Sequence, residues 1–84
     1  MKTVERLINA QGNVKLGNHR VEQVSRFGRA GRNFIYWQTA IVKTDDDNKR
    51  FEVDNGGWNT PSTNRAISAY RYQLKMLGYT EITA

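Results

Sequence analysis

A chain of 84 residues without cysteine has no disulfide or thiolate metal site, so packing alone must stabilise its small core. Thirteen lysine and arginine residues against eight aspartate and glutamate residues give a net charge of +5, which favours anionic partners without requiring them. The longest apolar run, residues 34–37, is too short to cross a membrane, and the first residues lack the apolar stretch of a signal peptide. We therefore expect a single domain, residues 1–84, in a soluble cytoplasmic protein that contacts no membrane.

The first third of the chain predicts a short helix followed by β structure. Residues 3–9 place their apolar side chains on one face at helical spacing, and Gly12 follows to stop the helix. Residues 13–27 alternate between apolar and polar side chains, with a break at residues 17–18. This pattern predicts a first β segment or hairpin.

The middle of the chain predicts an antiparallel hairpin over residues 33–54. Residues 33–44 are rich in β-branched and aromatic side chains, which indicates one continuous central strand. A charged turn at 45–50 and a short alternating segment follow it. The three adjacent aspartates of the turn lack the alternating spacing of a calcium loop, so we expect a solvated turn and no metal site.

A C-terminal helix follows, and its boundary signals agree with one another. Thr60 is a candidate N-cap, Pro61 occupies the first helical position, and Gly78 ends the helix. An apolar stripe expected to face the sheet consists of Ile67, Tyr70, Leu74 and Leu77. Together the elements predict an α+β fold, in which a small antiparallel sheet of three to five strands packs on this helix, with a short N-terminal helix.

An arginine-rich segment, residues 26–33, is the first candidate binding site. Its arginines are three apart with glycines between them, so in a loop the guanidinium groups can fan out around a phosphate. We expect the glycine turn at 55–57 to lie beside residue 33, and this would bring the arginines to the N-terminus of the C-terminal helix. The predicted nucleic-acid-binding residues are Arg26, Arg29, Arg32, Trp58, Thr60 and Thr63. The alternative is a flexible charged loop without a ligand.

Aromatic and helical residues form a second candidate, a protein-contact surface. Tyr36 and Trp37 lie on opposite faces of the predicted strand, so only one of them can pack on the helix. Arg65, Tyr72 and Met76 lie opposite the apolar stripe of the helix, and these residue types are enriched at interfaces. The alternatives are cross-strand packing for the aromatic residues and an ordinary solvated face for the helix.

Residues that would support catalysis are not marked in the sequence. His19 is the only histidine, and no serine occupies a nucleophile elbow. Triad chemistry and zinc hydrolysis are therefore unsupported, and we expect neither enzymatic activity nor a cofactor.

The stretch IYWQTAIVKTDDDNKRFEVDNGGWNTPSTNRAI, residues 35–67, resembles small domains carried by bacteriophages and other mobile elements. In those domains a strand with an aromatic residue leads through a turn and a second strand to a helix entry of the form W/Y-x-T-x-[ST]-T-x-R. The matching positions are Tyr36, Thr39, Ile41, Trp58, Thr60, Ser62, Thr63 and Arg65. The resemblance implies a phage context, in which small proteins often bind host enzymes or nucleic acid, and it implies no defined activity.

We therefore predict a non-enzymatic, phage-type accessory protein that binds nucleic-acid phosphates through the arginine segment and the helix N-terminus. The rival interpretation is a protein-binding inhibitor of a host or defence enzyme, of which anti-CRISPR proteins are one class. A stable homo-oligomer would favour a third interpretation, a structural or assembly role. A phage-encoded protein of any of these kinds would act in the cytoplasm of the host cell.

Overall fold

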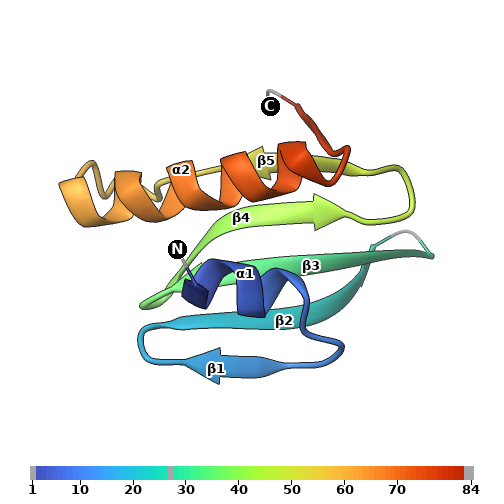
Figure 1. The fold of residues 1–84 in the computed structure, drawn as a ribbon, viewed down its shortest axis with the longest axis horizontal. Helices are drawn as coiled ribbons and strands as arrows, with labels where there is room; N and C mark the ends of the chain where they lie inside the picture. The colour runs from blue at the N-terminus through green and yellow to red at the C-terminus, as the bar shows by residue number, and fades with distance from the viewer. Residues whose placement is uncertain (1, 27, 83–84) are drawn as a thin grey trace.

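The computed structural model describes residues 2–26 and 28–82, and for Arg26 it describes the backbone alone. Within these residues the chain forms two helices and six strands. Their order is α1 (Lys2–Ile8), β1 (Val14–Leu16), β2 (His19–Arg26), β3 (Arg29–Tyr36), β4 (Thr39–Asp45), β5 (Arg50–Val53), α2 (Pro61–Met76) and β6 (Thr80–Glu81) (Figure 1).

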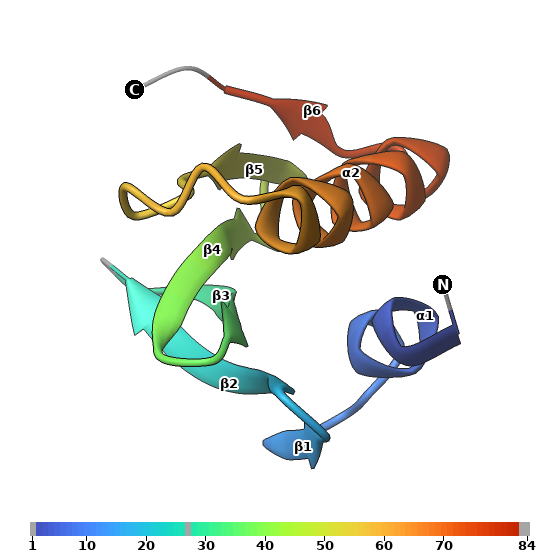
Figure 2. The same cartoon turned by 90° about the vertical axis from the view of Figure 1, so that its left-hand side faces the viewer.

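All six strands belong to one sheet, and their spatial order is the order of the chain. Each pair of neighbours from β1 to β5 is antiparallel, whereas β6 pairs in parallel with β5. Both helices lie on the same side of this twisted sheet (Figure 2). The predicted α+β class is confirmed, with six strands, of which the last contains two residues.

The hydrophobic core fills the space between the sheet and the two helices. Its largest fully buried apolar side chains are Tyr70, Phe34, Phe51, Leu7, Ile41, Leu74, Val4, Val21 and Val42. The stripe predicted for α2 is buried at Ile67, Tyr70 and Leu74, but Leu77 is 47% exposed. Leu77 leaves the stripe because α2 ends at Met76 and Leu77 is its C-cap.

The continuous strand predicted over residues 33–44 is instead two strands joined by a two-residue turn. Tyr36 pairs with Thr39, so Trp37 and Gln38 form the turn between β3 and β4. The register shifts after Phe34, where the sheet contains a β-bulge. The prediction was wrong because neither turn residue is a glycine, proline, asparagine or aspartate, the usual signals of a turn.

No helix among the described residues is long and apolar enough to cross a membrane.

Candidate functional site

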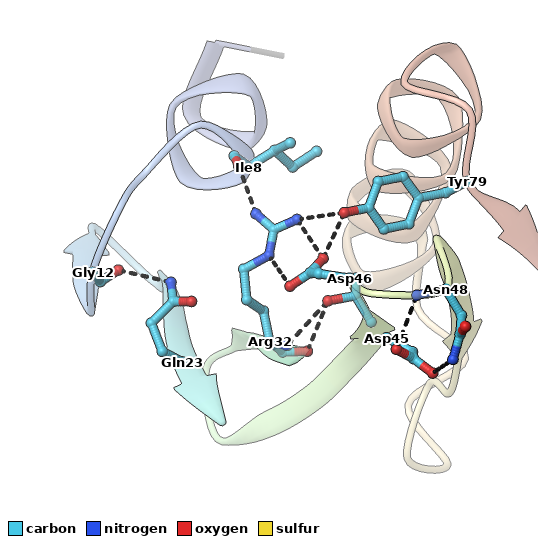
Figure 3. Close-up of polar contacts among 9 residues, drawn as sticks. Ile8, Gly12, Gln23, Arg32, Asp45, Asp46, Asn48 and Tyr79 are labelled. Atoms are coloured by element: carbon cyan, nitrogen blue, oxygen red, sulfur yellow. Dashed lines mark hydrogen bonds and ion pairs between the residues drawn. The ribbon is translucent and has the colours of Figure 1, made fainter. Parts of the chain in front are cut away.

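Arg32 is a buried structural residue, contrary to the exposed loop position that we predicted. It lies in β3 and is 8% exposed. Its Nε and Nη2 donate to the two carboxylate oxygens of Asp46 at 3.0 and 2.9 Å, and Nη1 donates to the carbonyl oxygen of Ile8 at 2.6 Å. The hydroxyl of Tyr79 also donates to Asp46, at 2.6 Å (Figure 3). The prediction failed because the segment continues the sheet, and strand alternation turns Arg32 toward the helices.

The other two arginines of the segment lie where β2 turns into β3. Arg29 is half exposed and pairs with Asp45, with 3.3 Å between Nε and Oδ2. Arg26 ends β2 opposite Arg29, and its side chain lies outside the part of the chain that the structure describes. Carboxylates therefore neutralise Arg29 and Arg32, and this reduces the charge that the segment can offer to a phosphate.

The arginine segment and the start of α2 lie at opposite ends of the sheet (Figure 1). β3 and β5 flank β4 and are both antiparallel to it, so β5 finishes at the same end of the sheet as β3. There the amide of Asp54 donates to the carbonyl of Ile41 at 2.9 Å. The acidic turn lies at the other end, where Asp47 accepts a hydrogen bond from the amide of Ala30 at 2.9 Å. Our expectation that residues 55–57 lie beside residue 33 was wrong, because it reversed β5 relative to β3.

A groove of about 560 Å³ is found at the end of the sheet where α2 begins. The β3–β4 hairpin contributes Tyr36, Trp37, Gln38, Thr39 and Ile41. The β5–α2 loop and the start of α2 contribute Asn55, Trp58, Thr60 and Thr63. Trp37 and Trp58 come from different walls and are 62% and 61% exposed. We term this site the tryptophan groove. It unites six of the eight positions that match the phage-domain pattern: Tyr36, Thr39, Ile41, Trp58, Thr60 and Thr63.

Trp37 is presented on a backbone that is unfavourable for its side chain. Its φ angle is 58°, in the left-handed region where an L residue other than glycine costs on the order of 1 kcal/mol or more. The amide of Trp37 donates to the carbonyl of Asn18 at 2.8 Å, and its carbonyl accepts from Nη1 of Arg20 at 3.4 Å. The neighbouring β1–β2 turn and β2 therefore hold the strained turn in place.

The opposite wall is fixed by the loop between β5 and α2. The side chains of Asp54 and Asn55 accept hydrogen bonds from the amides of Gly56 and Gly57 at 2.8 and 2.9 Å. Gly56 has a φ of +61°, and a Cβ there would meet the Thr39 side chain at 2.5 Å. Only glycine allows this close approach, which seats the loop against β4 and positions the tryptophan that follows.

The N-terminus of α2 is capped as predicted. The hydroxyl oxygen of Thr60 accepts from the amide of Thr63 at 3.3 Å, and Pro61 is the first helical residue. The Thr60 hydroxyl also donates to the Thr63 hydroxyl at 3.0 Å. The two threonines thus satisfy each other at the edge of the groove, and capping alone accounts for their types.

All nine lining residues of the tryptophan groove are uncharged. Hydrogen bonds from Ser62 and Trp37 lower the pKa of the Tyr36 hydroxyl. Within the described residues, the side-chain amide nitrogens of Gln38 and Asn55 and the indole nitrogen of Trp58 make no hydrogen bond. The groove therefore combines apolar ring surface with unused hydrogen-bond donors.

The helical residues of the predicted protein-contact surface are exposed on α2. Tyr72 and Met76 are 62% and 67% exposed, and Arg65 is exposed as well. Of the two strand aromatics, Tyr36 is half-buried and packs against the ring of His19, with 4.6 Å between the centroids. Trp37 is the one that faces solvent, because it lies in the turn and not on a strand face.

The sequence did not reveal the roles of three residues, Asp46, Tyr79 and Gln38. Asp46 and Tyr79 were not connected with Arg32, because they are 14 and 47 residues away along the chain. Gln38 was not recognised as a groove residue, because the turn that contains it was read as strand.

Among the described residues, no group of three or more histidine, cysteine, aspartate or glutamate side chains could hold a metal ion. His19 is 8% exposed, and its burial lowers the pKa of the imidazole.

Comparisons with family models, curated proteins and solved structures found no match, so the phage-domain resemblance stays a prediction.

Proposed function

We propose that this chain is a non-enzymatic binding protein that docks onto a partner protein through the tryptophan groove. The observation that carries the proposal is the pair of tryptophans, each more than 60% exposed, on two walls of one uncharged groove. Exposed tryptophans at the centre of a contact surface are frequent hot spots of protein–protein binding. Two large aromatic side chains exposed together in one groove are a feature typical of an interaction site.

Strain at Trp37 supports the same proposal. An exposed turn with φ near 58° is better served by glycine or asparagine. The ring of Trp37 packs edge-on against Tyr36, with 6.3 Å between the centroids, and this contact leaves the side chain 62% exposed. A binding role accounts for tryptophan at this position, because Trp37 lines the groove and is available to a partner. In this respect Trp37 resembles strained residues that cluster at ligand-binding sites.

The charge distribution favours a protein partner over nucleic-acid phosphates. Arg32 is bound to Asp46, Arg29 is paired with Asp45, and the groove itself is neutral. Phosphate binding would need free cations at the site, since phosphate contacts supply most of the affinity for nucleic acid. Inhibition of a host or defence enzyme remains the specific form of protein binding that we propose if the chain is phage-encoded.

A pull-down from host-cell lysate, with and without nuclease, tests the proposed function. We expect a defined protein to be retained by the wild type after nuclease treatment and at raised salt, because a neutral aromatic interface depends weakly on ionic strength. The double variant Trp37→Asn, Trp58→Ala should lose that protein. Tyr72→Ala is the matched control, because Tyr72 is as exposed as Trp37 but lies on α2 outside the groove.

Two results would contradict the proposal. Retention that disappears with nuclease would assign the groove, or another surface, to nucleic acid. Retention that is equal for the double variant and the wild type would place the protein-binding surface elsewhere.

A further inference from the structure

We infer that the tryptophan groove accepts a proline-rich segment in the extended polyproline II conformation. This inference rests on the proposed function and narrows it to one kind of polypeptide ligand. The groove lies between two exposed indole rings, and its volume of about 560 Å³ is within the range of roughly 300–1,000 Å³ typical of ligand sites. Aromatic-lined grooves of this type recognise polyproline II segments in several unrelated domains.

The sheet topology argues against recognition by strand addition. The turn that forms one wall joins β3 to β4, and each of these strands already has a neighbour on both sides. An extended peptide therefore finds no unpaired strand edge in the groove. The edges of the sheet are β1 and β6, and neither contributes a lining residue.

The polar lining argues against a helical or charged ligand. A helix satisfies its own backbone groups, so it would leave the free amide nitrogens of Gln38 and Asn55 without backbone partners. An acidic or phosphorylated segment would need arginine or lysine in the lining, and the nine lining residues are uncharged. An uncharged groove complements an uncharged segment.

A polyproline II segment matches the hydrogen-bond donors and the aromatic ring surface of the groove. Its backbone makes no internal hydrogen bonds, so its carbonyl oxygens are available to Gln38, Asn55 and the indole nitrogen of Trp58. Proline has no amide N–H and so needs few acceptors from the protein. Its rings pack on the flat faces of Trp37 and Trp58, and the segment loses little conformational entropy because it is already extended.

Intrinsic fluorescence offers a direct test, because Trp37 and Trp58 are the only two tryptophans of the chain and both belong to the groove. Decaproline and a panel of proline-rich decapeptides without tryptophan are titrated into the protein. We expect a saturable blue shift of the emission, since the peptide removes the indoles from water. A glycine–serine peptide of equal length should cause no shift.

Tryptophan variants test whether the peptide binds in the groove. Trp37→Asn suits the left-handed turn and leaves Trp58 as the reporter, whereas Trp58→Ala leaves Trp37 as the reporter. Each should weaken binding about tenfold or more, as expected for a hot-spot residue. Tyr72→Ala, on the outer face of α2, should change the affinity by less than about twofold.

The outcomes separate this inference from the proposed function. Absence of a saturable shift with every proline-rich peptide overturns the polyproline inference, while a tryptophan-dependent pull-down from nuclease-treated lysate would leave the proposed function intact. A saturable shift that Trp37→Asn and Trp58→Ala do not weaken also overturns the inference. A salt-sensitive shift with oligothymidylate, and none with the peptides, overturns both.

Discussion

The guanidinium of Arg32 and the carboxylate of Asp46 form a bidentate ion pair that joins β3 to the turn after β4. The same guanidinium donates to Ile8 at the end of α1, and the hydroxyl of Tyr79, just after α2, donates to Asp46. One buried arginine therefore connects the sheet with the C-terminal ends of both helices. This explains why a residue type expected in a ligand site is instead part of the structural core.

Arg32→Ala should destabilise the protein by about 2–4 kcal/mol, because it removes the charged donor of the partly buried Asp46 carboxylate and the donor to the carbonyl of Ile8. Asp46 then keeps the hydrogen bond from the neutral Tyr79 hydroxyl but loses its counter-charge. Arg29→Ala is the matched control. Its pair with Asp45 is half exposed, so we expect a loss below about 1 kcal/mol. Urea unfolding measures both, and equal effects of the two changes would contradict the structural role of Arg32.

Acid should weaken the fold through His19. Burial lowers the pKa of His19 below its ordinary value of 6.5, so the unfolded chain binds this proton at higher pH than the folded protein does. The free energy of unfolding should therefore fall as the pH drops below about 6.5. His19→Phe keeps an aromatic ring beside Tyr36 and should flatten this dependence. An unchanged slope between pH 7 and pH 5 in the variant would refute the assignment.

Asp46 acts in a lower pH window. Burial would raise the pKa of Asp46, but hydrogen bonds from Arg32 and Tyr79 outweigh burial and lower the pKa below 3.8. Its stabilisation is present above that value and is lost as the pH falls through the folded-state pKa. Asp46→Asn should lower stability at neutral pH and reduce the further loss below pH 4, as followed by circular dichroism. If wild type and variant lose stability in parallel there, this linkage is wrong.

Substitution of two leucines near the C-terminal end of α2 tests how this helix packs on the sheet. Leu74 is fully buried, so Leu74→Ala should cost about 2–5 kcal/mol. Leu77 is 47% exposed, so Leu77→Ala should cost less than about 1 kcal/mol. Thermal or urea unfolding distinguishes them, and similar costs at the two positions would mean that α2 is placed incorrectly.

Trp37→Asn should keep or raise the free energy of unfolding, by up to about 1 kcal/mol, because asparagine tolerates a positive φ better than tryptophan does. Lys49→Asn offers a control, since Lys49 has a φ of 53° in a turn remote from the groove. Both variants should be at least as stable as the wild type, and only Trp37→Asn should impair binding. A clear loss of stability in Trp37→Asn would show that the indole is a folding residue.

The C-terminal helix could be predicted from sequence because its signals are local. Thr60, Pro61 and the apolar spacing of Ile67, Tyr70 and Leu74 all act within one helix, and the structure places each as expected. The error at Leu77 concerns the last residue of the stripe, where the helix has already ended.

The groove could not be assembled from sequence because it depends on two non-local facts. The turn at Trp37 and Gln38 carries no ordinary turn residue, so the chain reads as a continuous strand through it. The direction of β5 relative to β3 then decides whether Trp58 meets Trp37 or the arginines, and a reversed direction gave the wrong neighbours. Arg32 was misplaced for a similar reason, since its carboxylate partner lies 14 residues away.

Docking of a partner protein over Trp37 and Trp58 is tested most directly by the two indole N–H signals of the ¹⁵N-labelled protein in an NMR spectrum. The partner recovered from nuclease-treated lysate is added unlabelled, and the signals are followed to saturation. We expect both indole signals to shift or broaden on binding, and we expect binding to be lost in the double variant Trp37→Asn, Trp58→Ala and kept in Tyr72→Ala. Binding that leaves both indole signals unchanged would contradict docking at this site.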